Sequence, residues 1–157
     1  MKKIMRLLCG VMVVMAANAC HQDHYDDWKI QNELWLKQNK TQPGVITTPT
    51  GLQYKVIYEG TKEDRKPNSN SYVTVDYCGK LIDGVVFDDN VTSAYVNTFI
   101  AGWIEGLCKM HLNADYIFYV PYDLAYGKEG TGKEGYEDFI PPYSTLIFEV
   151  HLSDIAN

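Results

Sequence analysis

Residues 99–107, which read FIAGWIEGL, constrain the fold of this chain of 157 residues more than any other stretch. Trp103 and Leu107 are four residues apart and Met110 follows three later, so a helix places all three on one face. Two glycines weaken so short a helix, and its stability must therefore come from the surface against which it packs. Strand patterns lie on both sides of it in sequence. We therefore expect this helix to cover a half-open barrel of strands.

The strand patterns predict an antiparallel sheet. Residues 72–78 alternate cleanly between apolar and polar side chains, and the Asp-Gly pair at 83–84 is a strong hairpin signal that returns the chain through 85–87. Residues 59–71 read as a polar loop. Further strands are predicted at 52–58, 116–120 and 145–152. Five or so strands and one short helix indicate an α+β domain.

The N-terminal residues read as an export signal. A basic start precedes an apolar run over 7–17, which is too short to anchor stably in a bilayer, and small residues precede Cys20. The Ala-Asn-Ala-Cys tetrapeptide resembles the lipobox of bacterial lipoproteins, in which the cysteine becomes the lipidated first residue. We expect 1–19 to be a signal peptide and Cys20 to carry the lipid. Cleavage to a free periplasmic protein is the alternative, because Ala17 stands where the lipobox prefers Leu.

Two further segments follow. Residues 20–48 are expected to form a tether that contains one helix over 27–38, capped by Asp26. Histidines and aspartates at its start are read as a solvated tail and not as a metal site. Residues 49–157 form the predicted globular domain, and 46% hydrophobic residues overall fit one domain of this size.

The charge balance excludes some partners. The formal net charge is -6, and it becomes -9 once the three basic residues of 1–19 are removed. A chain this acidic has no electrostatic reason to bind nucleic acid or an anionic membrane surface, so we expect membrane contact only through a lipid on Cys20. Cys78 and Cys108 are interpreted as free thiols, because their spacing defines no disulfide framework.

Five separate motifs carry a resemblance to a known family. They are GLQYKV at 51–56, VDYCGKLIDGVVFD at 75–88, GWIEGL at 102–107, PYDLAYG at 121–127 and IPPYSTLIFEV at 140–150. Together they resemble the FKBP-type peptidyl-prolyl cis-trans isomerases, most closely the bacterial Mip-like branch, over residues 49–155. The resemblance implies a twisted antiparallel sheet wrapped around a short helix, with Trp103 as the floor of a proline pocket.

The resemblance also implies a set of site residues. By the matching motifs, the expected catalytic residues are Tyr77, Asp88, Trp103 and Tyr126. The expected substrate-binding residues are Phe87, Phe99, Ile100, Ile140 and Phe148. The chain departs from the family near Ala94 and Tyr95, where a pocket-wall Phe is usual. The resemblance also implies that the loop between Gly127 and Ile140 overhangs the pocket, and in this chain the loop is longer than usual.

The implied function is peptidyl-prolyl isomerisation of exported proteins in the bacterial envelope, in the periplasm or at the outer membrane. It requires no cofactor and no metal. Expected partners are proline-containing polypeptides and, as inhibitors, macrolides. The alternatives are a non-catalytic module or chaperone that holds proline segments in the same pocket, and a scaffold whose pocket has decayed.

Two other activities are disfavoured by the residues. The glycine- and lysine-rich stretch 127–133 begins like a phosphate-binding loop, but Glu134 follows where Ser or Thr is needed. No recognised motif pairs a Ser, Cys or Thr with a histidine, which argues against hydrolase chemistry.

Overall fold

A computed structural model describes the backbone of residues 19–61 and 65–156, with side chains from residue 25 in the first range. The predicted signal peptide up to residue 18 lies outside the described residues. So do the side chains of Cys20 and of the histidines that precede residue 25. None of the helices in the described part of the chain combines the length and apolar character needed to cross a membrane.

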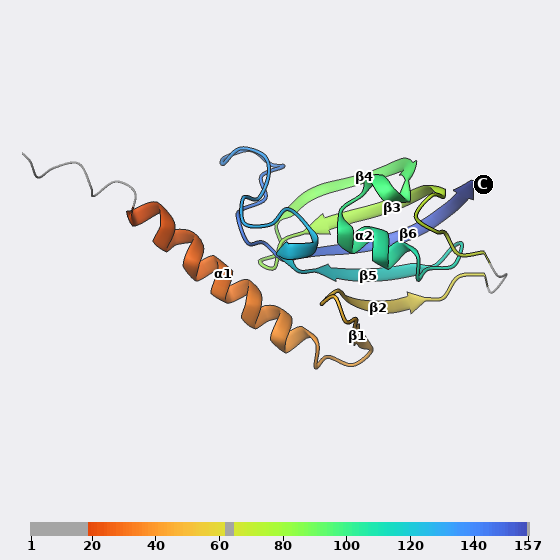
Figure 1. Cartoon of the computed structure of the whole chain (residues 1–157), viewed down its shortest axis with the longest axis horizontal. Coiled ribbons are helices and arrows are strands. Elements are labelled where there is room, and N and C mark those ends of the chain that lie inside the picture. The colour runs from red at the N-terminus through yellow and green to blue at the C-terminus, as the bar shows by residue number, and fades with distance from the viewer. Residues whose placement is uncertain (1–18, 62–64, 157) are drawn as a thin grey trace, which may run out of the picture.

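Six antiparallel strands in the described residues form one sheet in the order β1-β2-β5-β6-β3-β4, and the short helix α2 lies across one face of it (Figure 1). The strands are β1 (Val45–Thr47), β2 (Gln53–Tyr58), β3 (Tyr72–Lys80), β4 (Val86–Tyr95), β5 (Asp115–Val120) and β6 (Leu146–Ala156). The helices are α1 (Ala19–Asn39), the 3-10 turn η1 (Val96–Thr98), α2 (Ala101–Leu107) and the 3-10 turn η2 (Tyr122–Leu124). The predicted α+β architecture is confirmed.

Alternation of side chains places the core on the face covered by α2. In β3, Val73 and Val75 are fully buried, and in β6 every second residue from Leu146 to Leu152 is buried. The β1 strand was not predicted, because three residues are too few to show a period of two.

Helix α2 sits unusually close to the sheet because of its two glycines. A Cβ atom at Gly102 would lie 2.4 Å from Val120 Cγ1, and one at Gly106 would lie 2.6 Å from the ring of Phe118. Trp103 and Leu107 point into the core, as their spacing predicts. The glycines therefore weaken the isolated helix and at the same time allow the close contact that stabilises it.

The N-terminal helix α1 is longer than the predicted 27–38, since it already includes residue 19. The prediction that Asp26 caps it is wrong, because neither Gly nor Pro occurs within 19–39 to interrupt the helix. The second half of α1 packs on its own domain, where the ring of Trp35 lies 5.7 Å from that of Tyr119.

Substitution of Gly106 by alanine tests this packing. Helix propensity alone predicts a stabilisation of about 1 kcal/mol, whereas overpacking against Phe118 predicts a loss of about 1–3 kcal/mol. We expect the loss, measured by urea unfolding. The double variant Gly106→Ala/Phe118→Leu should lose less than the sum of the two single variants, because the smaller side chain makes room. An alanine variant as stable as the wild type would contradict the close contact.

Candidate active site

One face of the sheet holds a cavity of about 280 Å³ that gathers most of the predicted site residues. Its lining comprises Tyr77 of β3, Phe87 and Asp88 of β4, Thr98 of η1, Phe99 and Ile100 before α2, Trp103 of α2, Tyr126, and Phe148 of β6. Eight of the nine predicted residues are among them. Segments more than 70 residues apart in sequence thus meet around one hollow.

Trp103 forms the centre of a cluster of aromatic rings. Its indole is 3% exposed and lies 4.9 Å from the ring of Tyr77 and 5.1 Å from that of Phe148, both nearly perpendicular to it. Phe99 packs at 5.0 Å in a tilted arrangement. Such edge-to-face contacts are favourable for aromatic pairs. The indole Nε1 has no hydrogen-bond partner among the described residues, so packing alone holds the ring.

A short hydrogen bond joins Tyr77 to Asp88. The Tyr77 hydroxyl donates to Asp88 Oδ2 at 2.6 Å. Tyr77 pairs with Asn90 in the β3–β4 register. Because Asp88 is two residues from Asn90 in the same strand, the side chains of Tyr77 and Asp88 lie on the same face of the sheet. Burial, and then the hydrogen bond to the Asp88 carboxylate, raise the pKa of Tyr77 above its ordinary value. The phenol therefore stays protonated and acts as a donor.

Two donors stand at the edge of the cavity. Tyr126 is 41% exposed, and burial of its phenol, followed by the charge of Asp88, raises its pKa. The backbone N–H of Ile100 donates to no acceptor within the described chain. Both groups are free to donate to a carbonyl that enters the cavity.

The cavity lining differs from the predicted set at two positions, Ile140 and Thr98. Ile140 is buried but is not among the residues that line this cavity, and its main chain pairs with Thr131 through two hydrogen bonds of 2.9 Å. Near Tyr95 the sequence departs from the usual pocket-wall Phe, and Tyr95 does not line the cavity; its ring packs edge-on against that of Tyr72 at 5.1 Å. Thr98 lines the cavity instead and was missed, although its place next to Phe99 was a signal.

The long loop between Gly127 and Ile140 was expected to overhang the cavity. None of its residues 127–139 lines the cavity. No helix follows the phosphate-loop-like stretch 127–133, in agreement with its rejection as a nucleotide site.

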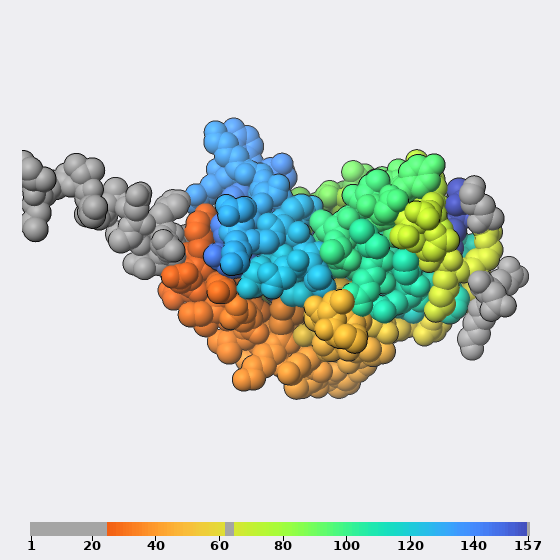
Figure 2. Space-filling view, in the orientation of Figure 1, coloured from red at the N-terminus to blue at the C-terminus, as the bar shows by residue number. Residues whose placement is uncertain are grey.

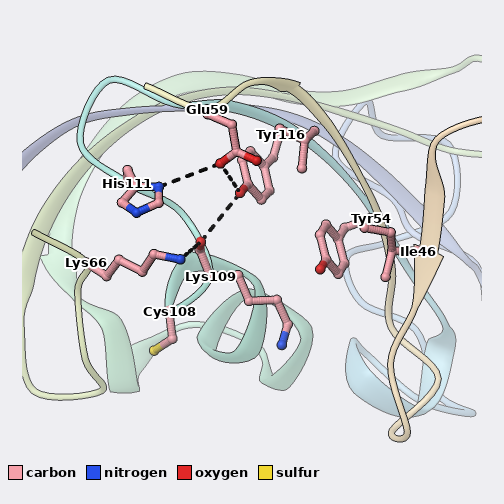
Figure 3. Close-up of a pocket in the computed structure, with 9 residues that line it drawn as sticks. Ile46, Tyr54, Glu59, Lys66, Cys108, Lys109, His111 and Tyr116 are labelled. Carbon is pink, nitrogen blue, oxygen red and sulfur yellow. Dashed lines mark hydrogen bonds and ion pairs between the residues drawn. The ribbon is translucent and has the colours of Figure 1, made fainter. Parts of the chain in front are cut away.

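A larger cavity of about 690 Å³ opens elsewhere, with Tyr54 and Tyr116 stacked at 5.8 Å along one wall (Figure 3). The thiol of Cys108 also lines it, and its sulfur points away from the His111 imidazole in Figure 3. Burial raises the pKa of the Cys108 thiol, which leaves it a poor nucleophile. Cys78 and Cys108 are both free.

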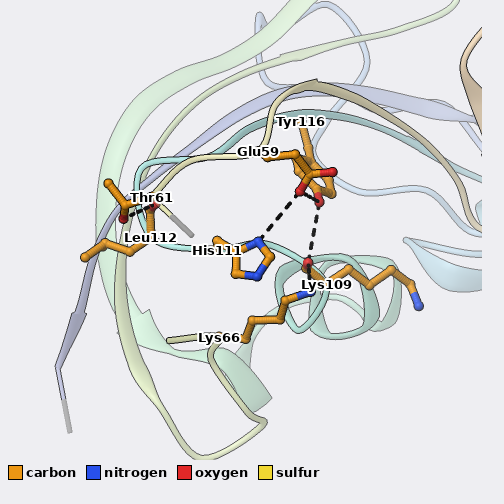
Figure 4. Close-up of polar contacts among 7 residues, drawn as sticks. All are labelled: Glu59, Thr61, Lys66, Lys109, His111, Leu112 and Tyr116. Carbon is orange, nitrogen blue, oxygen red and sulfur yellow. Dashed lines mark hydrogen bonds and ion pairs between the residues drawn. The ribbon is translucent and has the colours of Figure 1, made fainter. Parts of the chain in front are cut away.

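Polar groups at this second cavity fasten the segment after β2 to the turn after α2 (Figure 4). Glu59 Oε2 accepts a hydrogen bond from the Tyr116 hydroxyl at 3.2 Å and lies 3.6 Å from His111 Nδ1. Lys66 Nζ donates to the Lys109 carbonyl at 3.0 Å. Because these groups mainly satisfy one another and the main chain, we assign this cluster a structural role.

Comparison with known proteins agrees with the geometry of the first cavity. The sequence profile of the FKBP-type peptidyl-prolyl cis-trans isomerases matches residues 63–153, and the profile of the domain amino terminal to these isomerases matches residues 1–56. The chain therefore belongs to the FKBP-type peptidyl-prolyl cis-trans isomerases, with an N-terminal segment of the Mip- and FkpA-like bacterial branch.

Three bacterial relatives illustrate the similarity. The outer membrane protein MIP of Legionella longbeachae is 40% identical over 81% of this chain and 54% of its own length. An FKBP-type 22 kDa isomerase of Escherichia coli is 38% identical over 88% of this chain and 66% of its own length. The crystal structure of FkpA from Escherichia coli superposes with a TM-score of 0.78 at 33% identity, covering 88% of this chain and 64% of that one. The chain thus spans about half to two thirds of these relatives.

The hydrogen bond between Tyr116 and Glu59 generates a prediction for alkaline pH. Burial first, and then the charge of Glu59, raise the pKa of Tyr116 to about 12. Between pH 10 and 12 the unfolded chain loses the phenolic proton while the folded chain retains it, so this contribution to stability is complete below pH 10 and falls as pH rises.

We therefore expect Tyr116→Phe to lower stability at pH 8 and to flatten the decline of the free energy of unfolding above pH 10, measured by urea unfolding. The exposed Tyr58 supplies a matched control, because Tyr58→Phe should follow the wild-type curve. Parallel curves for the wild type and Tyr116→Phe would show that Tyr116 ionises equally in both states.

Proposed function

We propose that this chain catalyses cis-trans isomerisation of X-Pro peptide bonds in polypeptides. The observation that carries the proposal is a hollow floored by Trp103 and walled by aromatic rings, with the hydrogen-bonded Tyr77–Asp88 pair at its side. Membership of the family supports the same activity.

The reaction needs little chemistry from the protein. Rotation about an X-Pro bond breaks amide resonance and faces a barrier of about 18–20 kcal/mol, which makes it slow without a catalyst. No proton leaves carbon and no covalent bond forms, so neither a nucleophile nor a cofactor is required. The catalyst has only to bind the twisted geometry more tightly than the planar one.

The apolar rings favour the twisted bond by excluding water. A planar amide carries more charge separation than a twisted one, so a dry surface destabilises the planar ground state more. Trp103, Phe87 and Phe148 offer such a surface around a pyrrolidine ring. A hollow of about 280 Å³ suits a single side chain of that size and admits it from solvent.

The polar groups hold the chain while the bond turns. The free N–H of Ile100 and the hydroxyl of Tyr126 are placed to donate to carbonyls on either side of the proline. Asp88 accepts a hydrogen bond from the Tyr77 hydroxyl. We assign its carboxylate the role of interacting with the rotating carbonyl group. Each tenfold in rate requires only about 1.4 kcal/mol of differential stabilisation, so several modest effects suffice together.

A non-catalytic binding module that uses the same hollow is the second candidate. It has the same rings and donors and differs only in lacking preference for the twisted bond. A scaffold with a decayed pocket is disfavoured because Tyr77, Asp88, Trp103 and Tyr126 still line one cavity.

Protease-coupled isomerisation of a short X-Pro peptide separates these candidates. We expect catalysis by the wild type, a loss of about tenfold or more in kcat/KM for Asp88→Val, and a loss of about two- to tenfold for Tyr126→Phe. Tyr58→Phe, outside the cavity, is the control and should match the wild type. A folded wild type that binds a macrolide inhibitor yet gives the buffer rate would leave only the binding module.

We further propose that the chain works in the bacterial envelope on exported proteins. The basic and apolar start followed by small residues supports a signal peptide over 1–19, and the tetrapeptide that ends at Cys20 supports lipidation there. One relative is named an outer membrane protein. A lipid on Cys20 then provides the only membrane contact.

Mass spectrometry of the protein isolated from bacterial membranes tests the anchor. We expect the mature chain to begin at Cys20 and to carry a diacyl or triacyl group. The variant Cys20→Ser should lose the lipid and leave the membrane fraction. An unmodified N-terminus on the wild type would rule out the lipoprotein.

A further inference from the structure

Helix α1 crosses one end of the sheet and contacts three adjacent strands there. Along its length it meets the start of β6, the end of β5 and the start of β2. Figure 2 shows α1 in orange directly against the blue segment that precedes β6. The first of these contacts leads back to the active-site cavity.

Two side chains of α1 fix the segment 141–145. Asn32 is fully buried; its Oδ1 accepts a hydrogen bond from the Thr145 N–H at 2.7 Å, and its Nδ2 donates to the Trp28 carbonyl at 2.8 Å. Trp28 Nε1 donates to Ser144 Oγ at 2.9 Å, and the same hydroxyl donates to the Pro141 carbonyl at 2.7 Å. Removing one partner from such a buried network leaves polar groups unsatisfied.

The fixed segment in turn holds the residue next to Tyr126. The Tyr143 N–H donates to the Gly127 carbonyl at 3.1 Å, and the Gly127 N–H donates to the Tyr122 carbonyl at 2.9 Å. Tyr143 adopts a φ of 62°, which is uncommon for a residue with a side chain and persists only when its surroundings enforce it. Lys29 of α1 lies 5.2 Å from the centre of the Tyr143 ring and adds to that support.

We propose that Asn32 and Trp28 are positioning residues, which act through the 141–145 segment and Gly127 to hold the Tyr126 hydroxyl at the active-site cavity. Helix α1 is then part of the catalytic apparatus as well as a connection to the N-terminus. The expected effect of these residues on catalysis rests on the proposed function. Their expected effect on the position of Tyr126 does not.

The other end of the same helix provides a matched control. Asn39 Nδ2 donates to Gln53 Oε1 at 2.9 Å, and Gln53 Nε2 donates to the Leu36 carbonyl at 3.0 Å. This contact also docks α1 through a buried amide, but it meets β2 and not the segment that holds Tyr126. Asn39→Ala should therefore destabilise docking without moving Tyr126.

The kinetic test is a double-mutant cycle on the full chain with an X-Pro peptide. We expect Asn32→Ala to lower kcat/KM by about two- to tenfold, and to add less than twofold to the loss in a Tyr126→Phe background. Asn39→Ala should retain wild-type kcat/KM. Fully additive losses, wild-type activity of a folded Asn32→Ala protein, or an equal loss in Asn39→Ala would overturn the proposal.

A second readout does not depend on activity. In protein labelled with 3-fluorotyrosine, the ¹⁹F resonance of Tyr126 is the one lost in Tyr126→Phe. We expect it to shift or broaden in Asn32→Ala and to stay in place in Asn39→Ala. If Asn32→Ala does not fold, Trp28→Phe retains an aromatic side chain but lacks the indole N–H that donates to Ser144 Oγ, and it should move the same resonance. An unmoved resonance in the folded variant contradicts the proposal, and it does so even if the wild type proves inactive.

Discussion

The contact between the indole of Trp103 and the rings of the sheet is the interaction on which the rest of this structure depends. Gly102 and Gly106 lie on either side of it and let α2 approach Val120 and Phe118 at distances no other residue would allow. The indole then lies deep enough to leave a hollow above it, while the perpendicular rings of Tyr77 and Phe148 keep it from tilting.

The active-site cavity combines an apolar floor, formed by Trp103, with polar groups at its edge. Aromatic packing holds the indole of Trp103 at the floor, although its buried Nε1 has no hydrogen-bond partner among the described residues, whereas the donors at the edge are available to a peptide. That separation of apolar and polar surfaces suits a reaction in which the only change is rotation about one bond. The same arrangement connects to α1 through the 141–145 segment, so the cavity above Trp103 and the N-terminal helix form one packed unit.

Local patterns predicted most of the fold and most of the cavity. The alternation of apolar and polar side chains in β3 and β6 is a local pattern, and it predicted correctly which residues face the core. The Asp-Gly turn is also local in sequence. The resemblance supplied eight residues of the cavity lining. Ile140 could not be placed from sequence, because its pairing with Thr131 is set by how a long loop folds back on itself. The true start of α1 and its docking through Asn32 depend on tertiary contacts that no periodicity shows.

NMR on the labelled protein tests most directly whether Trp103 floors the site where a prolyl ring binds. The chain has three tryptophans, so the indole signal of Trp103 can be assigned with one substitution. On titration with an Ala-Pro peptide, we expect nuclear Overhauser effects between the Trp103 ring and the pyrrolidine protons. Binding that instead perturbs only Tyr54 and Tyr116 of the larger cavity, with Trp103 unchanged, would contradict it.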